Sequence, residues 1–245
     1  MNEELASAPD PLRSIAETVR VIVAAGVPYG VIVAGAGSRL AMMALRLSSP
    51  DRVIGVKSDD DFVIGKFTLA GSYNLLLLGA IFGIIGAAAY LLVAPWLIGP
   101  IWFRRVTVGL ACAAVVGSML VHADGIDFTQ LKPKWFAIGL FVTLPALFGT
   151  FIGVAVDAVR SPDSWTANGR RRWLIPIVAI ACFPPTVLPV IIVAAVAAMV
   201  IAIGDSARIR RLRATVGYSL AVRATWLLIA IVGLGALITD IAELT

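Results

Sequence analysis

Long blocks of this sequence contain no Asp, Glu, Lys, Arg or His, and this feature limits the possible folds of the chain most. The longest blocks are residues 67–103 and 173–204. The hydrocarbon core of a bilayer is about 30 Å thick, and about 20 helical residues cross it. Of the 245 residues, 60% are hydrophobic and 14% are charged, whereas soluble domains are roughly 45–50% apolar and about 25% charged. The sequence therefore predicts a multi-pass membrane protein.

The predicted fold class is an all-α polytopic membrane protein with a single membrane-embedded domain over residues 1–245. Small residues recur at every fourth position in several apolar blocks, as in Gly79-x-x-x-Gly83 and Gly149-x-x-x-Gly153. Such stripes let helix backbones approach closely in a membrane, so we expect a compact helical bundle. Six transmembrane helices are predicted, at about 19–40, 73–96, 106–121, 135–156, 173–203 and 216–238.

The fifth of these blocks leaves two arrangements open. As one helix, residues 173–203 would be about 46 Å long, which exceeds an ordinary span. Pro184, Pro185 and Pro189 interrupt the block, so it forms either one kinked helix or a hairpin that enters and leaves on the same side. The hairpin would give seven membrane segments. The positive-inside rule favours the hairpin, because it brings the two arginine clusters that flank the block to one side.

The longest polar interruption, residues 48–71, predicts a small β-hairpin at the membrane surface, at about 52–69. Two β-leaning runs, Arg52–Lys57 and Phe62–Leu69, flank a polar turn. The turn holds three consecutive acids, which would either bind a cation or keep the turn solvated. The second interpretation is the commoner one for such a sequence.

The candidate polar site is centred on His122, the only histidine of the chain. The 48–71 loop precedes the second span and the 122–134 loop follows the third, so both loops must lie on one membrane face. Histidine titrates near neutrality and suits proton relay or cation binding. The competing interpretation is structural, with a turn, a helix cap and a helix end in this stretch. The predicted site residues are His122, Asp124, Asp127, Asp59, Asp60 and Asp61.

The basic residues lie mostly in the loops between apolar blocks. The net charge of +5 and the pI of about 9.6 therefore indicate anionic lipid headgroups and membrane orientation rather than nucleic acid. Cys112 and Cys182 lie inside apolar blocks without metal-ligand spacing, and we expect no metal and no cofactor. The predicted headgroup contacts are Arg170, Arg171, Arg172, Arg208, Arg210, Arg211 and Arg213.

Two patterns near the N-terminus are typical of local structures, a helix start and a dinucleotide-binding turn. Asp10-Pro11 followed by Ser14-x-x-Glu17 predicts a helix start with a capping box, and the acidic opening argues against a cleaved signal peptide. The stretch VIVAGAGSRL has the glycine spacing of a dinucleotide-binding turn, but Leu40 stands where the third glycine is needed. No soluble sheet follows to complete such a fold, so we reject nucleotide binding.

Three stretches, GAGSRLAMMALRL, VKSDDDFVIGKFTL and LVHADGIDF, resemble a group of multi-pass membrane proteins of high-GC bacteria that have no assigned activity. The likeness extends over roughly the first two-thirds of the chain. It implies a bacterial plasma membrane and carries over no catalytic residue.

The function that these patterns favour is a non-enzymatic accessory or scaffold component in the bilayer. Its loops would contact a protein partner or a second copy of the chain, and anionic lipids would surround it. One alternative is a small transporter or channel with a polar site at His122, Asp124 and Asp127 and a broken helix at Pro184–Pro189. The other is a membrane enzyme that acts on a lipid-linked substrate, with His122 and one of the two aspartates as acid and base.

Overall fold

The computed structural model describes residues 11–55, 68–122, 131–164, 166, 169–204, 211, 213 and 215–244, and only the backbone of Arg52, Arg170 and Gly204. Regular structure in these ranges is entirely helical, with seven helices when α1–η1–α2 is counted as one. The α-helices are α1 (Pro11–Gly30), α2 (Gly37–Ser48), α3 (Leu69–Val93), α4 (Ile101–Leu120), α6 (Lys134–Arg160), α7 (Leu174–Cys182), α8 (Val187–Gly204) and α10 (Val216–Leu244). The π-helix η1 (Val31–Ala36) joins α1 to α2, and the 3₁₀ turns are η2 (Asp51–Val53), η3 (Ala94–Trp96), η4 (Gly169–Trp173) and η5 (Pro184–Thr186).

Six of the helices are long and apolar enough to cross a membrane, which confirms the multi-pass class. Several run beyond the predicted spans: the first is continuous over Pro11–Ser48, and α6 continues to Arg160. A helix whose apolar centre lies in hydrocarbon continues into polar sequence because nothing at the membrane surface interrupts its backbone hydrogen bonds. The glycine-rich stretch that resembles a nucleotide-binding turn is part of this first helix, so the rejection of a strand–turn–helix unit is confirmed.

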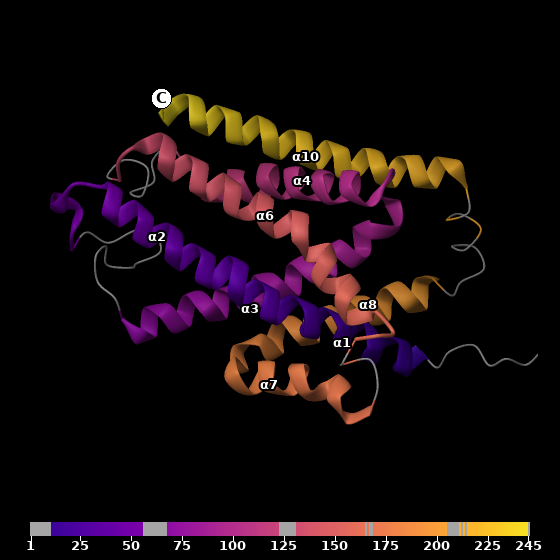
Figure 1. Ribbon diagram of the computed structural model, residues 1–245. Helices are drawn as coiled ribbons and strands as arrows, with labels where there is room; N and C mark the ends of the chain where they lie inside the picture. Colours follow the sequence, from indigo (N-terminus) through magenta and orange to yellow (C-terminus); the bar gives the residue numbers. More distant parts are fainter. Residues whose placement is uncertain are drawn as a thin grey trace, which may run out of the picture.

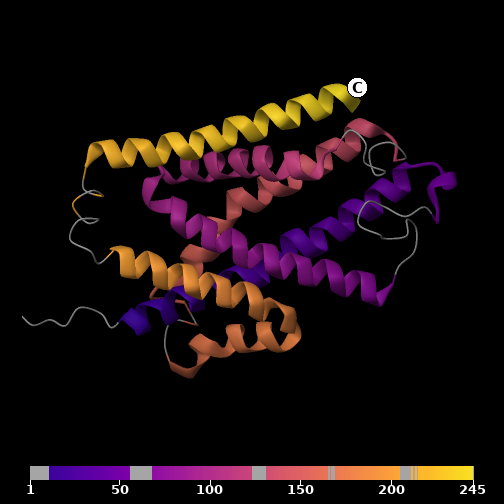
Figure 2. The ribbon, with the colours of Figure 1, turned by 180° about the vertical axis from the view of Figure 1, so that it is seen from behind.

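The helices are arranged in successive layers rather than as a closed ring (Figures 1 and 2). Helix α10 forms one edge and packs on α4, which packs on α6. Helices α1 and α3 form the middle of the molecule. Helices α7 and α8 lie at the opposite edge, and both contact α1.

The contact between α1 and α3 is a close approach of two backbones. A Cβ built on Gly79 would lie 2.6 Å from the carbonyl oxygen of Gly30 and 2.8 Å from Cα of Gly35. Gly26 and Gly83 oppose each other in the same way one or two turns further along. The predicted role of the Gly79-x-x-x-Gly83 stripe is therefore confirmed, and its partner is the glycine-rich part of the first helix.

A second close approach joins α4 and α6. A Cβ built on Gly149 would lie 2.6 Å from Cβ of Cys112 and 2.8 Å from the carbonyl oxygen of Val108. On the other side of α4, Gly233 of α10 faces the backbone of Ala114, with a built Cβ 3.0 Å from that carbonyl oxygen. Small residues thus set the spacing of the outer layers as well.

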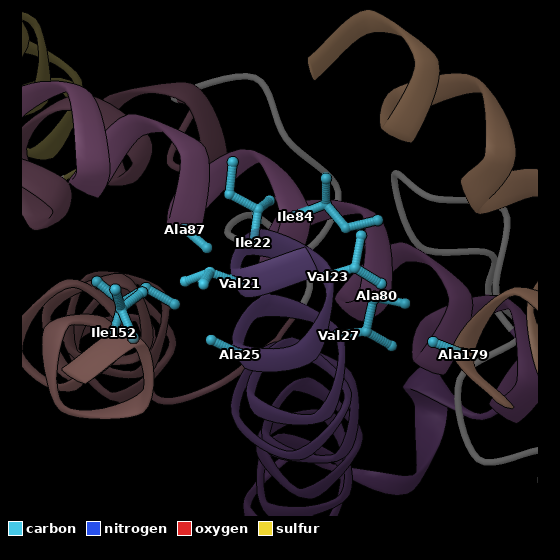
Figure 3. Packing of buried hydrophobic residues seen from close by; sticks show 11 residues of the cluster. Val21, Ile22, Val23, Ala25, Val27, Ala80, Ile84, Ala87, Ile152 and Ala179 are labelled. Carbon is cyan, nitrogen blue, oxygen red and sulfur yellow. The ribbon is translucent and has the colours of Figure 1, made fainter. Parts of the chain in front are cut away.

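The main core surrounds the C-terminal half of α1 (Figure 3). Residues 20–27 are buried on every side of the helix over two turns, as expected for a helix with neighbours all round. The side chains that meet there come from four helices: Val21, Ile22, Val23, Ala25 and Val27 from α1, Ala80, Ile84 and Ala87 from α3, Ile152 from α6 and Ala179 from α7.

The helix directions define two ends of the molecule. The end that we call the arginine face holds the start of α1 and the segment 161–173, where Arg20 contacts Thr166. It also holds the ends of α3 and α8 and the start of α10 (Figure 1). The opposite end, the Ser49 face, holds Ser49, Val53, His122, residues 131–134 and the end of α10.

The block at 173–203 is divided into two helices. Helix α7 ends at Cys182, η5 contains Pro184 and Pro185, and α8 then runs back beside α1 towards the arginine face (Figures 1 and 2). The two prolines cannot donate backbone hydrogen bonds, and they end α7. The hairpin is therefore the arrangement present, rather than one kinked helix.

The predicted β-hairpin at about 52–69 is wrong where the structure describes it. Residues Asp51–Val53 form a 3₁₀ turn, Gly55 has a φ of 89°, and α3 begins at Leu69 with Thr68 as its cap. The rest of the proposed hairpin lies outside the described residues. One β-branched residue of the proposed strand is part of the core instead, since Val53 is buried in one cluster with Val121 and Leu131.

Candidate functional site

The Ser49 face brings together the described ends of the two loops that were expected to meet. Ser49 Oγ donates to the carbonyl oxygen of Lys132 at 3.1 Å and accepts from the Lys132 N–H at 3.0 Å. Val53 and Val121 are buried in one cluster with Leu131. The prediction that the 48–71 and 122–134 loops share a membrane face is therefore confirmed for the parts that are described.

His122 lies on this face at the end of α4. Its neighbour Val121 is fully buried and closes the helix, with its N–H donating to the carbonyl oxygen of Gly117 at 2.9 Å, whereas the His122 side chain is exposed. An exposed imidazole at a membrane boundary is open to a ligand. The acids expected beside it, Asp124, Asp127, Asp59, Asp60 and Asp61, lie outside the described residues, so this site stays a prediction.

The arginines predicted to contact headgroups differ in environment. Arg171, Arg211 and Arg213 are exposed, as a headgroup contact requires. Arg172 is half-buried and its Nη2 donates to Oε2 of Glu17. Arg208, Arg210 and the side chain of Arg170 lie outside the described part of the chain.

The most elaborate polar cluster at the arginine face is one that the sequence analysis missed. Arg20 is only 3% exposed, and its Nε donates to both carboxylate oxygens of Glu17 at 3.0 Å. Its Nη2 donates to Glu17 Oε1 at 2.6 Å, and its Nη1 to the carbonyl oxygen of Thr166 at 3.4 Å. Glu17 also accepts from Arg172. The carboxylate therefore ties the start of α1 to the segment that leads into the α7–α8 hairpin.

Two details of the sequence could have indicated this cluster. Glu17 and Arg20 are three residues apart, which places them on one side of a helix. Arg20 is also the last charged residue before the uncharged stretch 21–38. The capping box expected at Ser14 and Glu17 is not formed. Ser14 lies inside α1 rather than at its start, and its carbonyl oxygen accepts from Thr18, so Glu17 has no capping role.

The tip of the α7–α8 hairpin is held by hydroxyl groups. The Tyr73 hydroxyl of α3 donates to the carbonyl oxygen of Cys182 at 3.1 Å, and the Tyr73 ring stacks on Phe183. Thr186, which is fully buried, donates to the carbonyl oxygen of Phe183 at 2.7 Å. Non-helical backbone at membrane depth needs such partners, so Tyr73 and Thr186 stabilise the break.

The apolar blocks of the sequence contain no acidic, basic or histidine side chain. All 36 Lys, Arg, Asp, Glu and His side chains of the sequence lie outside residues 21–38, 67–103, 106–121, 135–156, 173–204 and 224–239. Within the described residues, no group of three or more His, Cys, Asp or Glu side chains is placed to hold a metal ion. The membrane centre therefore offers hydroxyls and backbone carbonyls but no charged relay.

Comparison with models of protein families, with curated proteins and with solved structures finds no match for this chain.

Proposed function

We propose that this protein is a non-enzymatic scaffold or accessory component of a bacterial plasma membrane, and that it contacts a protein partner or a second copy through its loops. The absence of Asp, Glu, Lys, Arg and His from the centre of every apolar block of the sequence carries this proposal. Ion and proton pathways through membranes are marked by such residues. Rigid glycine contacts between α1 and α3 and between α4 and α6 add support, because they suit a fixed shape better than a moving one.

The proposed orientation places the arginine face in the cytoplasm. Eleven described arginines lie on that face, against three arginines and two lysines on the Ser49 face. By the positive-inside rule, the face with more basic residues is cytoplasmic. The arginine-face residues are Arg13, Arg20, Arg104, Arg105, Arg160, Arg170, Arg171, Arg172, Arg211, Arg213 and Arg223, and those of the Ser49 face are Arg39, Arg46, Arg52, Lys132 and Lys134. The loops that include His122 would then be extracytoplasmic.

Cysteine labelling checks this orientation. In a background without Cys112 and Cys182, Arg171→Cys should react with a membrane-impermeant maleimide only from the cytoplasmic side, and His122→Cys only from outside. Arg13→Cys is the matched control, because Arg13 is exposed on the same face as Arg171. Labelling of the Arg171 and His122 variants from one side would contradict the crossing of α6 between them, and labelling of Arg171→Cys from outside would contradict the orientation.

Replacement of His122 separates the scaffold from the two alternatives. After mild extraction of the tagged full-length protein, we expect a partner or a second copy to co-purify at a fixed molar ratio, and we expect His122→Ala to keep that ratio. The imidazole is exposed, so its loss should change the melting temperature by less than about 2 °C. Purification as a bare monomer, or loss of a transport or catalytic activity in this variant, would favour the transporter or the enzyme.

A further inference from the structure

We infer that Arg172 holds the phosphate of one ordered anionic phospholipid at the arginine face. This inference does not depend on the scaffold role. The cluster formed by Glu17, Arg20 and Arg172 contains two guanidinium groups and one carboxylate, so it keeps one positive charge in excess. Arg20 uses Nε, Nη1 and Nη2 in bonds to the protein. Arg172 is therefore the member of the cluster with donors to spare.

The Nε atom of Arg172 is buried and has no hydrogen-bond acceptor among the described residues. A buried N–H without an acceptor costs about 1–3 kcal/mol, and more when the group is charged. Such an orphan in a folded protein usually indicates a bound water or ion. An anion satisfies both the orphan N–H and the excess positive charge, whereas water satisfies only the first.

Glu17 fixes Arg172 in place for this task. The carboxylate accepts from Nη2 of Arg172, so the guanidinium does not lose the entropy of a free side chain when a ligand binds. The side chain of Arg172 is 32% exposed, so part of it is open to a ligand at the membrane surface. A planar guanidinium with free N–H groups matches the oxygen atoms of a phosphate.

The depth of the cluster identifies the source of the phosphate as a lipid. Arg20 immediately precedes residues 21–38, which contain no Asp, Glu, Lys, Arg or His. The cluster therefore lies at the boundary of the hydrocarbon, where headgroup phosphates lie. Trp173 follows Arg172 directly and is 38% exposed, and tryptophan is enriched at this level of a membrane. Exposed Arg171, Arg211 and Arg213 lack a fixing carboxylate among the described contacts and would attract lipids only loosely.

Native mass spectrometry of the delipidated full-length protein tests this site. With added phosphatidylglycerol, the wild type should retain one lipid per chain, and Arg172→Gln should bind it at least about tenfold more weakly. Arg13→Gln is the matched control, because Arg13 is exposed on the same face, and it should bind as the wild type does. Phosphatidylcholine should bind more weakly to the wild type, because its headgroup carries no net negative charge.

Three results would overturn the inference. Equal losses in the Arg13 and Arg172 variants would show loose attraction by the whole face. Stabilisation of the wild type by inorganic phosphate as strongly as by phosphatidylglycerol would assign the site to the free anion. If Arg172→Gln does not fold, Arg172→Lys keeps the charge beside Glu17 but loses Nε, and unchanged lipid retention by this variant would likewise exclude the site.

Discussion

Replacing Gly79 by alanine is expected to cause one of the largest losses of stability of any single methyl addition at the described glycines. The added Cβ would lie 2.6 Å from the carbonyl oxygen of Gly30 and 2.6 Å from the backbone nitrogen of Gly35. Both neighbours are backbone atoms, so no side chain can rotate away and the two helices must separate. Overpacking of a core costs about 1–3 kcal/mol, and we expect about 3 kcal/mol here because the contact between α1 and α3 holds the central layer together.

The matched control for Gly79→Ala is Gly235→Ala in α10. A Cβ at Gly235 meets nothing within 4 Å, and alanine is the better helix former by about 1 kcal/mol. The control should therefore be neutral or slightly stabilising. Unfolding of the purified protein by titration with sodium dodecyl sulfate, followed by tryptophan fluorescence, measures both changes. Equal effects of the two substitutions would show that the α1–α3 contact is not the close approach described above.

The positions of the membrane helices could be predicted because hydrocarbon accepts only long uncharged segments. The apolar blocks of the sequence predicted the five long helices other than α8 within a few residues at most ends. The glycine stripe at Gly79 and Gly83 also predicted close packing, but it did not name the partner. The partner follows from the order of the layers, which depends on how all the helices fit together.

The local errors arose where a short pattern had two physical explanations. Val53 lies in a run with the composition of a strand, but it is part of a 3₁₀ turn and is buried in one cluster with Val121. Ser14 and Glu17 have the spacing of a capping box, but α1 already includes Ser14, and Glu17 binds two arginines. Propensity describes only the local chain, so contacts with residues more than 60 positions away cannot be read from it.

The hairpin tip illustrates the same difference between local and long-range signals. Pro184 and Pro185 predicted a break, because neither residue can donate a backbone hydrogen bond. Nothing in the sequence indicates that Tyr73, 109 residues away, supplies a hydroxyl to Cys182. Likewise, the arginine run at 170–172 predicted lipid contact, but which of the three is fixed by Glu17 depends on the fold.

Removal of the Glu17 carboxylate is expected to have the second large effect. Glu17→Ala leaves Arg20, which is 3% exposed, without a counter-charge, and it releases Arg172 from α1. Breaking a buried ion pair by removing one partner costs about 3–5 kcal/mol, because the remaining charge stays desolvated. We expect about 3 kcal/mol, at the lower end, since the Glu17 side chain is 40% exposed and water can partly replace it. The same detergent titration measures this loss.

Two further variants separate the buried charge from a general loss of contacts. Glu243→Ala removes an exposed carboxylate near the end of α10, and it should change the free energy of unfolding by less than about 0.5 kcal/mol. The double variant Glu17→Leu with Arg20→Met removes both charges and keeps most of the apolar volume. It should recover much of the stability lost in Glu17→Ala, because an uncompensated charge costs more than an apolar pair in the same place. A double variant no more stable than Glu17→Ala would mean that the contacts of Glu17 with Arg172, rather than the desolvated charge of Arg20, determine the stability of this face.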